Sequence, residues 1–288
     1  MVCAPGRLSH GAWMSGSQGS VVLITGASSG IGKACAELLS ARGHIVYGTS
    51  RRPVEAAPPG YRMLELDVTQ DDSVQRAVAT VLSREGRIDV VVNNAGHALA
   101  GAAEDTSIEE ARAQLDANFL GALRVCKAVL PSMRERRAGR IIQVSSLGGQ
   151  VGLPFQSLYS ASKFALEGFT EALRQEVAEF GIEATLVQPG DVRTQLTQNR
   201  VCVAKAGAGS AYRERFEAVL KAIESGERGG LAAEDVAKKV LEVMERGAPH
   251  VRYPVAQLAQ RVAVVAKTVL PSRTFEQIVM SIYGLRRR

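Results

Sequence analysis

Short β-branched runs alternate with helical segments along most of this chain, and this alternation restricts the fold more than any other feature of the sequence. Six runs predict strands at 21–25, 44–50, 61–67, 87–93, 140–146 and 182–189, and a short one is expected at 249–254. Between the runs, apolar residues recur with a helical period, as at Val74, Val78 and Val81. The order predicts an α/β fold: a doubly wound, mostly parallel Rossmann sheet with helices on both faces.

The segments between the strands refine this prediction. Long helices are expected at 107–136 and 157–180, the second with Gly181 as its C-cap. Three prolines within 51–60 leave little room for a crossover helix between the second and third strands. With no internal repeat and no domain boundary, we expect one domain over 20–288, preceded by a disordered tail over 1–19; Met14 is an alternative start.

The composition is that of a soluble globular protein with a sizeable core: 46% of the 288 residues are hydrophobic and 22% are charged. Neither a signal peptide nor an apolar run of about 18 residues is seen. The four cysteines have neither CxxC nor metal-ligand spacing, which predicts reduced thiols, no metal and a cytoplasmic protein; they are Cys3, Cys35, Cys126 and Cys202.

The formal charge of +6 is unevenly distributed, because the stretch from Arg261 to the end holds six basic residues and one acid, Glu276. A solvated basic tail is the interpretation we favour. A peripheral contact with an anionic membrane surface remains open. A nucleic-acid partner is not expected.

A Gly-rich turn, TGASSGIGKA at 25–34, connects the first strand to the first helix. Gly26, Gly30 and Gly32 would let backbone N–H groups and the helix N-terminus approach a pyrophosphate. A strand–helix turn without a ligand is the alternative, because the G-x-x-x-G-x-G spacing is weak by itself.

The end of the second strand bears on cofactor choice. It reads Thr49-Ser50-Arg51-Arg52 and has no carboxylate for a ribose 2′-hydroxyl. A guanidinium suits a 2′-phosphate, so the sequence predicts NADP(H) bound through Arg51, with Lys33 within reach.

From about Ser20 to Thr194 the chain resembles the short-chain dehydrogenase/reductase family. The resemblance is carried, in order, by TGASSGIG, LDVT (66–69), NNAG (93–96), Asn118, SS (145–146), YSASK (159–163) and QPGDVRT (188–194). It implies a set of cofactor contacts: Gly26, Ser28, Ser29, Gly30, Ile31, Gly32, Arg51, Asp67, Val68, Asn94, Ala95, Gly96, Tyr159, Lys163, Pro189, Gly190, Val192 and Thr194.

The resemblance also implies a catalytic tetrad of Asn118, Ser146, Tyr159 and Lys163. In many members the serine precedes the tyrosine by 13 residues, which selects Ser146; its neighbour Ser145 would face the other side of the strand. Tyr159 would be the general acid/base for hydride transfer between NADP(H) and a carbonyl/alcohol pair. Lys163, one helical turn away, would lower the phenol pKa, and Ser146 would orient the substrate oxygen. Asn118 would hold a water in a proton relay.

Substrate residues are expected in the loop 147–158 and after Thr194. Leu153, Pro154 and Phe155 would wall the pocket with Ser146 and Tyr159, and 195–288 would form a lid and C-terminal helices. The long C-terminal part resembles the hydroxysteroid/retinol dehydrogenase branch, which implies a lipophilic steroid-, retinoid- or lipid-like substrate.

Several questions remain open at this point. A 3-oxoacyl thioester or polyketide ketoreductase is one alternative function, and a non-catalytic NADP(H)-binding scaffold or sensor is another. The resemblance implies a homodimer or homotetramer through the helices 107–136 and 157–180. His97 either lines the pocket or is a solvated loop residue, and Asp191 has no assigned role.

Overall fold

The computed structural model describes residues 19–52, 59–194 and 200–285. Its centre is a sheet of seven strands in the order β11-β7-β6-β4-β1-β2-β3, and every pair of neighbours is parallel. The strands are β1 (Val21–Ile24), β2 (Ile45–Ser50), β3 (Arg62–Glu65), β4 (Val90–Asn93), β6 (Gly139–Val144), β7 (Ile182–Pro189) and β11 (Arg252–Val255). The predicted fold class is confirmed, and the short run near 249–254 is the edge strand β11.

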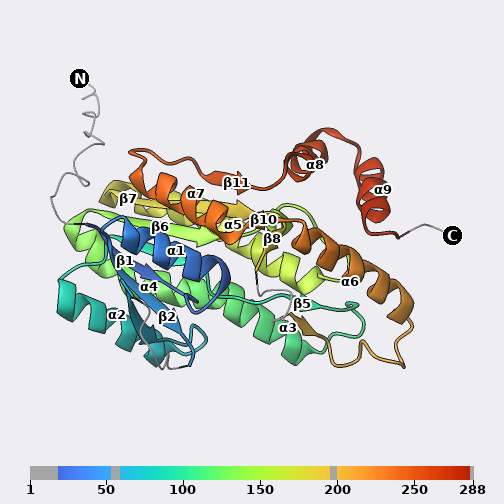
Figure 1. Ribbon diagram of the computed structural model, residues 1–288, viewed down its shortest axis with the longest axis horizontal. Helices are drawn as coiled ribbons and strands as arrows, with labels where there is room; N and C mark the ends of the chain where they lie inside the picture. Colours follow the sequence, from blue (N-terminus) through green and yellow to red (C-terminus); the bar gives the residue numbers. More distant parts are fainter. Residues whose placement is uncertain (1–18, 53–58, 195–199, 286–288) are drawn as a thin grey trace, which may run out of the picture.

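Helices cover both faces of this sheet (Figure 1). Packed against it are α1 (Gly30–Ala41), α2 (Asp71–Glu85), α4 (Gly121–Arg136), α5 (Ser157–Val177) and α7 (Ala233–Glu245). The helices α1 and α7 share one buried cluster with the strands, and α2, α4 and α5 share the other. The chain is therefore wound to both sides of the sheet.

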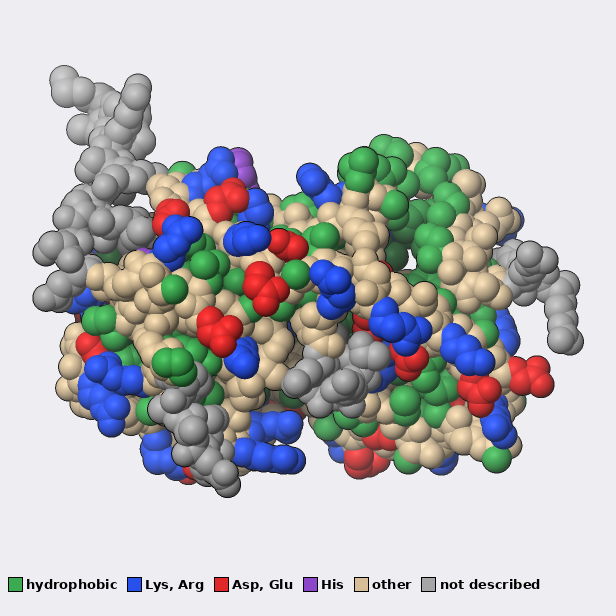
Figure 2. Space-filling view, viewed as in Figure 1, with side chains coloured by type: hydrophobic (Ala, Val, Ile, Leu, Met, Phe, Trp, Pro, Cys, Tyr) green, Lys and Arg blue, Asp and Glu red, His purple; other side chains and the backbone are tan. Residues whose placement is uncertain are grey.

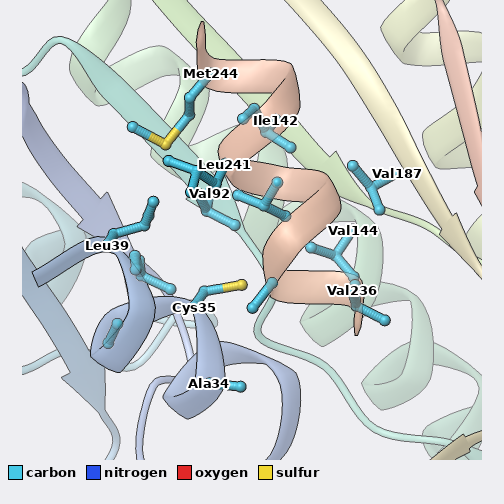
Figure 3. Close-up of a cluster of buried hydrophobic side chains, with 14 of the residues drawn as sticks. Ala34, Cys35, Leu39, Val92, Ile142, Val144, Val187, Val236, Leu241 and Met244 are labelled. Carbon is cyan, nitrogen blue, oxygen red and sulfur yellow. The ribbon is translucent and has the colours of Figure 1, made fainter. Parts of the chain in front are cut away.

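The core is aliphatic because β-branched residues supply most strand positions on both faces. Figure 3 shows Val92, Ile142, Val144 and Val187 of the strands beneath Leu39 of α1 and the α7 side chains. These four strand side chains are at most 5% exposed. Burial of each contributes roughly 1.5–3 kcal/mol, which fixes the sheet as a rigid base for the groups at its carboxyl edge.

The chain reverses its winding direction between β1 and β4, which are neighbours in the sheet. From β1 it moves to β2 and β3 on one side, and from β4 to β6, β7 and β11 on the other. Ligands of open α/β sheets bind outside the carboxyl ends of the strands at such a switch point. The Gly-rich turn follows β1 there, and 94–97 follow β4.

The expected helix at 107–136 has an interruption that the sequence did not indicate. It is composed of α3 (Ile108–Leu115), a π-helical turn (Asp116–Leu120) and α4. A π turn widens the helix locally and is often found at functional sites. The one expected at 157–180 is confirmed: α5 continues through a 3₁₀ turn (Ala178–Phe180) to Gly181, whose φ is 67°.

Beyond the sheet, α6 (Arg213–Arg228), α8 (Leu258–Val269) and α9 (Ser272–Ile282) lie together at one end of the molecule (Figure 1). Two short ladders accompany them, β5 (Leu99–Ala100) with β9 (Val201–Cys202), and β8 (Val192–Arg193) with β10 (Leu231–Ala232). Across the described ranges, no helix combines the length and the apolar character that crossing a membrane requires. The predicted disordered tail and most of the proline-rich link lie outside the described residues, at 1–18 and 53–58.

Candidate active site

A cavity of about 1250 Å³ runs along the carboxyl edge of the sheet. It is larger than the roughly 300–1000 Å³ that a drug-sized ligand occupies, so it has room for a dinucleotide and a second molecule. All four predicted catalytic residues line it: Asn118, Ser146, Tyr159 and Lys163. The expected cofactor contacts line it as well, except Gly32.

The Gly-rich turn has the geometry that a bound phosphate requires. Ser29 is the N-cap of α1 but makes no side-chain capping hydrogen bond, so the first N–H groups of the helix remain available to an anion. Gly32 acts by packing: a Cβ there would lie 2.3 Å from the Gly26 carbonyl oxygen and 2.5 Å from Asn94 Nδ2. Asn94 Nδ2 in turn donates to the carbonyl of Gly26 at 3.1 Å and ties the turn to β4. These residues fit the diphosphate of a dinucleotide.

Both arginines after β2 line the cavity. The Arg51 charge lies near enough to His97 to lower the pKa of that imidazole, as a smaller cause after burial. Lys33 instead lines a neighbouring hollow and pairs with Glu37 at 3.8 Å. The guanidinium of Arg51 therefore faces the cavity, as the 2′-phosphate argument requires.

Tyr159 and Ser146 meet at the floor of the cavity. The Ser146 hydroxyl lies near enough to the Tyr159 phenol to act on its pKa, and Ser146 Oγ accepts the N–H of Gly148 at 3.0 Å. The net effect on the Tyr159 pKa is an increase, because burial disfavours the phenolate more than the Ser146 hydroxyl favours it. The expected lowering of this pKa is not seen. Ser145 also lines the cavity, but its hydroxyl lies 2.9 Å from a Cβ built on Gly149, next to Glu167 of α5.

Lys163 lies one turn after Tyr159, with its ammonium 6.0 Å from the centre of the tyrosine ring. Nζ donates to the carbonyl of Val144 at 2.8 Å. Burial lowers the pKa of this ammonium to about 8, partly opposed by the charge of Glu167. The lysine is thus fixed at the end of β6 and titrates far below a free lysine.

Asn118 sits in the π turn, and three hydrogen bonds hold its amide. Oδ1 accepts the N–H of His97 at 3.0 Å, while Nδ2 donates to the carbonyl of His97 at 3.0 Å and to Ser162 Oγ at 3.1 Å. Gly96 allows this approach, because a Cβ there would lie 2.7 Å from Oδ1. The side chain therefore joins the loop after β4 to α5, and His97 lines the cavity rather than extending into solvent.

Asp191, for which the sequence offered no role, connects the loop after β7 to α8. Its carboxylate accepts a hydrogen bond from Gln260 Nε2 at 2.6 Å, and its N–H donates to Gln260 Oε1 at 3.4 Å. Burial, and then the charge of Glu227, raises the pKa of Asp191. Nearby, Arg200 forms a buried ion pair with Glu227 of α6. No sequence pattern signalled these contacts, since 69 residues separate Asp191 from Gln260.

The far half of the cavity is walled by helices that follow Thr194. The residues that α6, α8 and α9 contribute are Ala222, Ile223, Gly226, Glu227, Ala259, Gln260, Ala263, Val264, Phe275, Ile278, Val279 and Ile282. Most are aliphatic, in contrast to the polar groups near Tyr159. The expectation that the C-terminal segment contributes to a pocket thus agrees with the geometry, although the sequence did not name these residues.

Only part of the loop before α5 lines the cavity as the sequence predicted. Leu153 lines the cavity, but Pro154 and Phe155 do not. Phe155 has a φ of 58°, and its ring packs 5.7 Å from that of Phe216 on α6. The correction has a physical reason: the turn directs the phenyl ring to the α6 cluster, where its apolar surface is partly buried.

Comparison with known proteins agrees with this geometry. The short chain dehydrogenase family matches residues 20–202. The chain belongs to the short-chain dehydrogenase/reductase family. Among its relatives, 3-ketodihydrosphingosine reductase of Bacteroides thetaiotaomicron is 44% identical, covering 93% of this chain and 100% of that protein. The 17-beta-hydroxysteroid dehydrogenase type 1 of Mus musculus is 37% identical over 81% of this chain and 73% of its own.

Among solved structures, a short-chain dehydrogenase from Streptomyces avermitilis matches with a TM-score of 0.80 and 32% identity, covering 93% of this chain and 98% of its own. The protein is thus an oxidoreductase of the hydroxysteroid dehydrogenase-like kind, and its fold binds a nicotinamide cofactor.

Proposed function

We propose that this oxidoreductase transfers a hydride between NADP(H) and the ketone or secondary alcohol of a lipophilic, lipid- or steroid-like substrate. One observation carries the proposal. A single cavity joins the Gly-rich turn to Ser146, Tyr159 and Lys163, and continues without interruption into the aliphatic wall of α6, α8 and α9. A polar reacting carbon and a long apolar body would each find matching surroundings there.

The roles follow from the positions of the side chains. Ser146 and Tyr159 both line the cavity and lie near each other, so a substrate carbonyl oxygen between them would receive a hydrogen bond from each hydroxyl. The raised Tyr159 pKa keeps the phenol protonated at neutral pH, as a proton donor to a developing alkoxide requires. The ammonium of Lys163 would stabilise the phenolate that remains. The cofactor, when bound, supplies the hydride.

The preference for NADP(H) over NAD(H) is supported by Arg51 and Arg52. They follow β2 where an acid would accept a ribose 2′-hydroxyl, and both line the cavity. A guanidinium beside a 2′-phosphate forms charge-assisted hydrogen bonds.

The substrate class is tested by assaying purified protein with NADPH against long-chain ketones, ketosteroids and 3-oxoacyl thioesters. The proposal expects turnover of the first two. Turnover of thioesters alone would establish the alternative ketoreductase function. Binding of NADPH without turnover of any carbonyl would indicate a scaffold or sensor, which the arrangement of Ser146 and Tyr159 disfavours.

We extend the proposal to assembly and location. Assembly as a homodimer or homotetramer through α4 and α5 is supported by the half-exposed Phe164 on α5 and Leu120 at the start of α4. A cytoplasmic location is supported by the three free cysteines of the described ranges: Cys35 and Cys126, whose burial raises each thiol pKa to about 12, and the exposed Cys202. A peripheral membrane contact through the basic C-terminal region is compatible with such a location, because it needs no helix that spans the bilayer.

A further inference from the structure

The two C-terminal helices have an unusual concentration of exposed apolar surface. Of the ten large hydrophobic side chains that are exposed in the described ranges, six belong to α8 and α9. Four of them follow one another along α8: Leu258, Val262, Val265 and Val269. Their spacing of four, three and four residues places them on one helix face, about 17 Å long.

The opposite side of α8 is also apolar, because Ala263 and Val264 line the cavity. The helix therefore has one apolar side toward the cavity and another toward solvent. Figure 2 shows hydrophobic side chains gathered around a hollow where Figure 1 draws α8 and α9. The outer stripe is 57–75% exposed, more than a helix in water normally leaves uncovered.

The two apolar surfaces meet at the mouth of the cavity. Ile278 and Ile282 of α9 both line the cavity, yet they are 40% and 61% exposed. They therefore stand at its rim and are separated by one helical turn. An apolar molecule reaching the cavity past them would remain in contact with hydrocarbon side chains.

The charged residues around this apolar surface indicate what kind of partner it binds. The helices carry the exposed Arg261 and Arg273 against the single acid Glu276. The ammonium of Lys267, in contrast, donates to the carbonyl of Gln150 and lies 4.9 Å from the centre of the Phe164 ring. Three further arginines, 286–288, follow in the sequence beyond the described residues. An apolar helix face with a basic surround is the pattern of a helix lying in the interface of an anionic membrane.

We propose that α8 and α9 dock on an anionic lipid surface and open the mouth of the cavity toward the bilayer. The stripe from Leu258 to Val269 enters the hydrocarbon boundary, and Arg261 and Arg273 contact anionic headgroups. A lipophilic substrate then passes between bilayer and cavity beside Ile278 and Ile282. The docking is inferred from the apolar and basic residues of α8 and α9 alone. The passage of substrate rests on the proposed function.

Vesicle co-sedimentation of the full-length protein tests the docking. We expect sedimentation with phosphatidylcholine vesicles that contain phosphatidylserine, weaker sedimentation with phosphatidylcholine alone, and release by salt. The double variant Val262→Asp/Val265→Asp should lower partitioning by about 100-fold or more, since the bilayer would no longer bury two exposed valines. Reversing Arg261 and Arg273 to Glu should lower it roughly 30-fold on the anionic vesicles.

Matched controls are available on α3. Ile108→Asp alters an apolar side chain of similar exposure, and Arg112→Glu reverses an exposed charge; neither should change sedimentation. Failure of the wild-type protein to bind either vesicle, or equal loss in the α3 variants, would overturn the proposal. So would unchanged vesicle binding in the Val262/Val265 variant accompanied by a lower oligomeric mass in light scattering, because the stripe would then be an interface between two copies.

The two parts of the proposal are separated by activity assays. With a long-chain ketone in vesicles, the Val262→Asp/Val265→Asp variant should turn over more slowly than the wild type, whereas a short soluble ketone should react equally with both. Equal rates of both proteins on the vesicle-borne ketone would refute the passage of substrate. Absence of turnover in the wild type would refute the proposed function and leave the vesicle-binding result intact.

Discussion

Gly32 offers a test of whether its role is packing or contact with a ligand. An alanine Cβ there would lie 2.3 Å from the carbonyl oxygen of Gly26 and 2.5 Å from Asn94 Nδ2. Real Cβ contacts do not occur below 3.0 Å, and the Gly26 oxygen is backbone that cannot rotate away. Forcing extra volume into a rigid site costs up to about 3 kcal/mol, while replacing glycine within a helix recovers at most about 1 kcal/mol. We expect Gly32→Ala to lose about 2 kcal/mol of stability.

Thermal unfolding measures this loss, and Gly168 in α5 supplies the control. A Cβ on Gly168 meets nothing within 4 Å, so Gly168→Ala should show only the helix-propensity gain. At about 2–4 °C per kcal/mol for a chain of this size, Gly32→Ala should lower the Tm by roughly 4–8 °C and Gly168→Ala should raise it by about 1–4 °C. NADPH titration of both variants should show weakened binding for Gly32→Ala alone, because the turn that presents Gly26 is displaced.

The comparison of the two alanine variants decides between these roles. If Gly32→Ala unfolded at or above the wild-type temperature, the packing between α1, Gly26 and Asn94 would not be as tight as the distances require. If its stability fell while NADPH binding was unchanged, the link between the turn and the cofactor would be refuted. Only a loss of both stability and NADPH binding supports the interpretation that Gly32 shapes the cofactor turn by close packing.

Three further predictions concern the chemistry of the site. Tyr159→Phe should reduce turnover by about 10²-fold or more with unchanged NADPH binding; retained turnover would refute the acid/base role. Because burial lowers the pKa of Lys163 to about 8, the ammonium is lost as pH rises through that value and the reduction rate should fall; Lys163→Arg should move this fall to higher pH, and an unmoved profile would assign it to another group. The free energy of unfolding should change in the opposite direction to the reduction rate. The folded protein binds the Lys163 proton more weakly than the unfolded chain does, so its stability should rise from about pH 8 to 10.5. Arg51→Ala should weaken NADPH binding about tenfold or more and leave NADH binding nearly unchanged; a wild-type preference for NADH would contradict the 2′-phosphate argument.

The features of the fold and the site that could be predicted from the sequence are those that neighbouring residues along the chain determine. Strand runs such as 87–93 and 140–146 are continuous and apolar, so the parallel sheet and its order of elements were predictable. Ser146 was chosen over Ser145 by the 13-residue spacing to Tyr159 that the family resemblance implies; both serines line the cavity, and Ser146 is the one that interacts with Tyr159. The glycines of the first turn were recognisable, although the packing role of Gly32 required knowledge of Asn94.

The rest depended on contacts between distant parts of the chain. The π turn that positions Asn118 has no signature of its own, because its residues continue the helical period of α3 and α4. The pairing of Asp191 with Gln260 joins a strand end to a helix 69 residues later. The lowered Lys163 pKa arises from burial, which only the assembled site defines. Each of these is a tertiary effect without a sequence pattern.

The contact between Asp191 and Gln260 also connects the two proposals. It is a polar link between α8 and the loop after β7, on which Pro189 and Gly190 line the cavity. Gly190 is held against the same amide, since a Cβ there would lie 2.3 Å from Gln260 Oε1. The outer face of α8 is the stripe proposed to enter a membrane, and its inner face walls the substrate half of the cavity. A force on α8 from a lipid surface would therefore act on the loop that borders the cofactor half, which gives membrane docking a physical route to influence turnover as well as substrate supply.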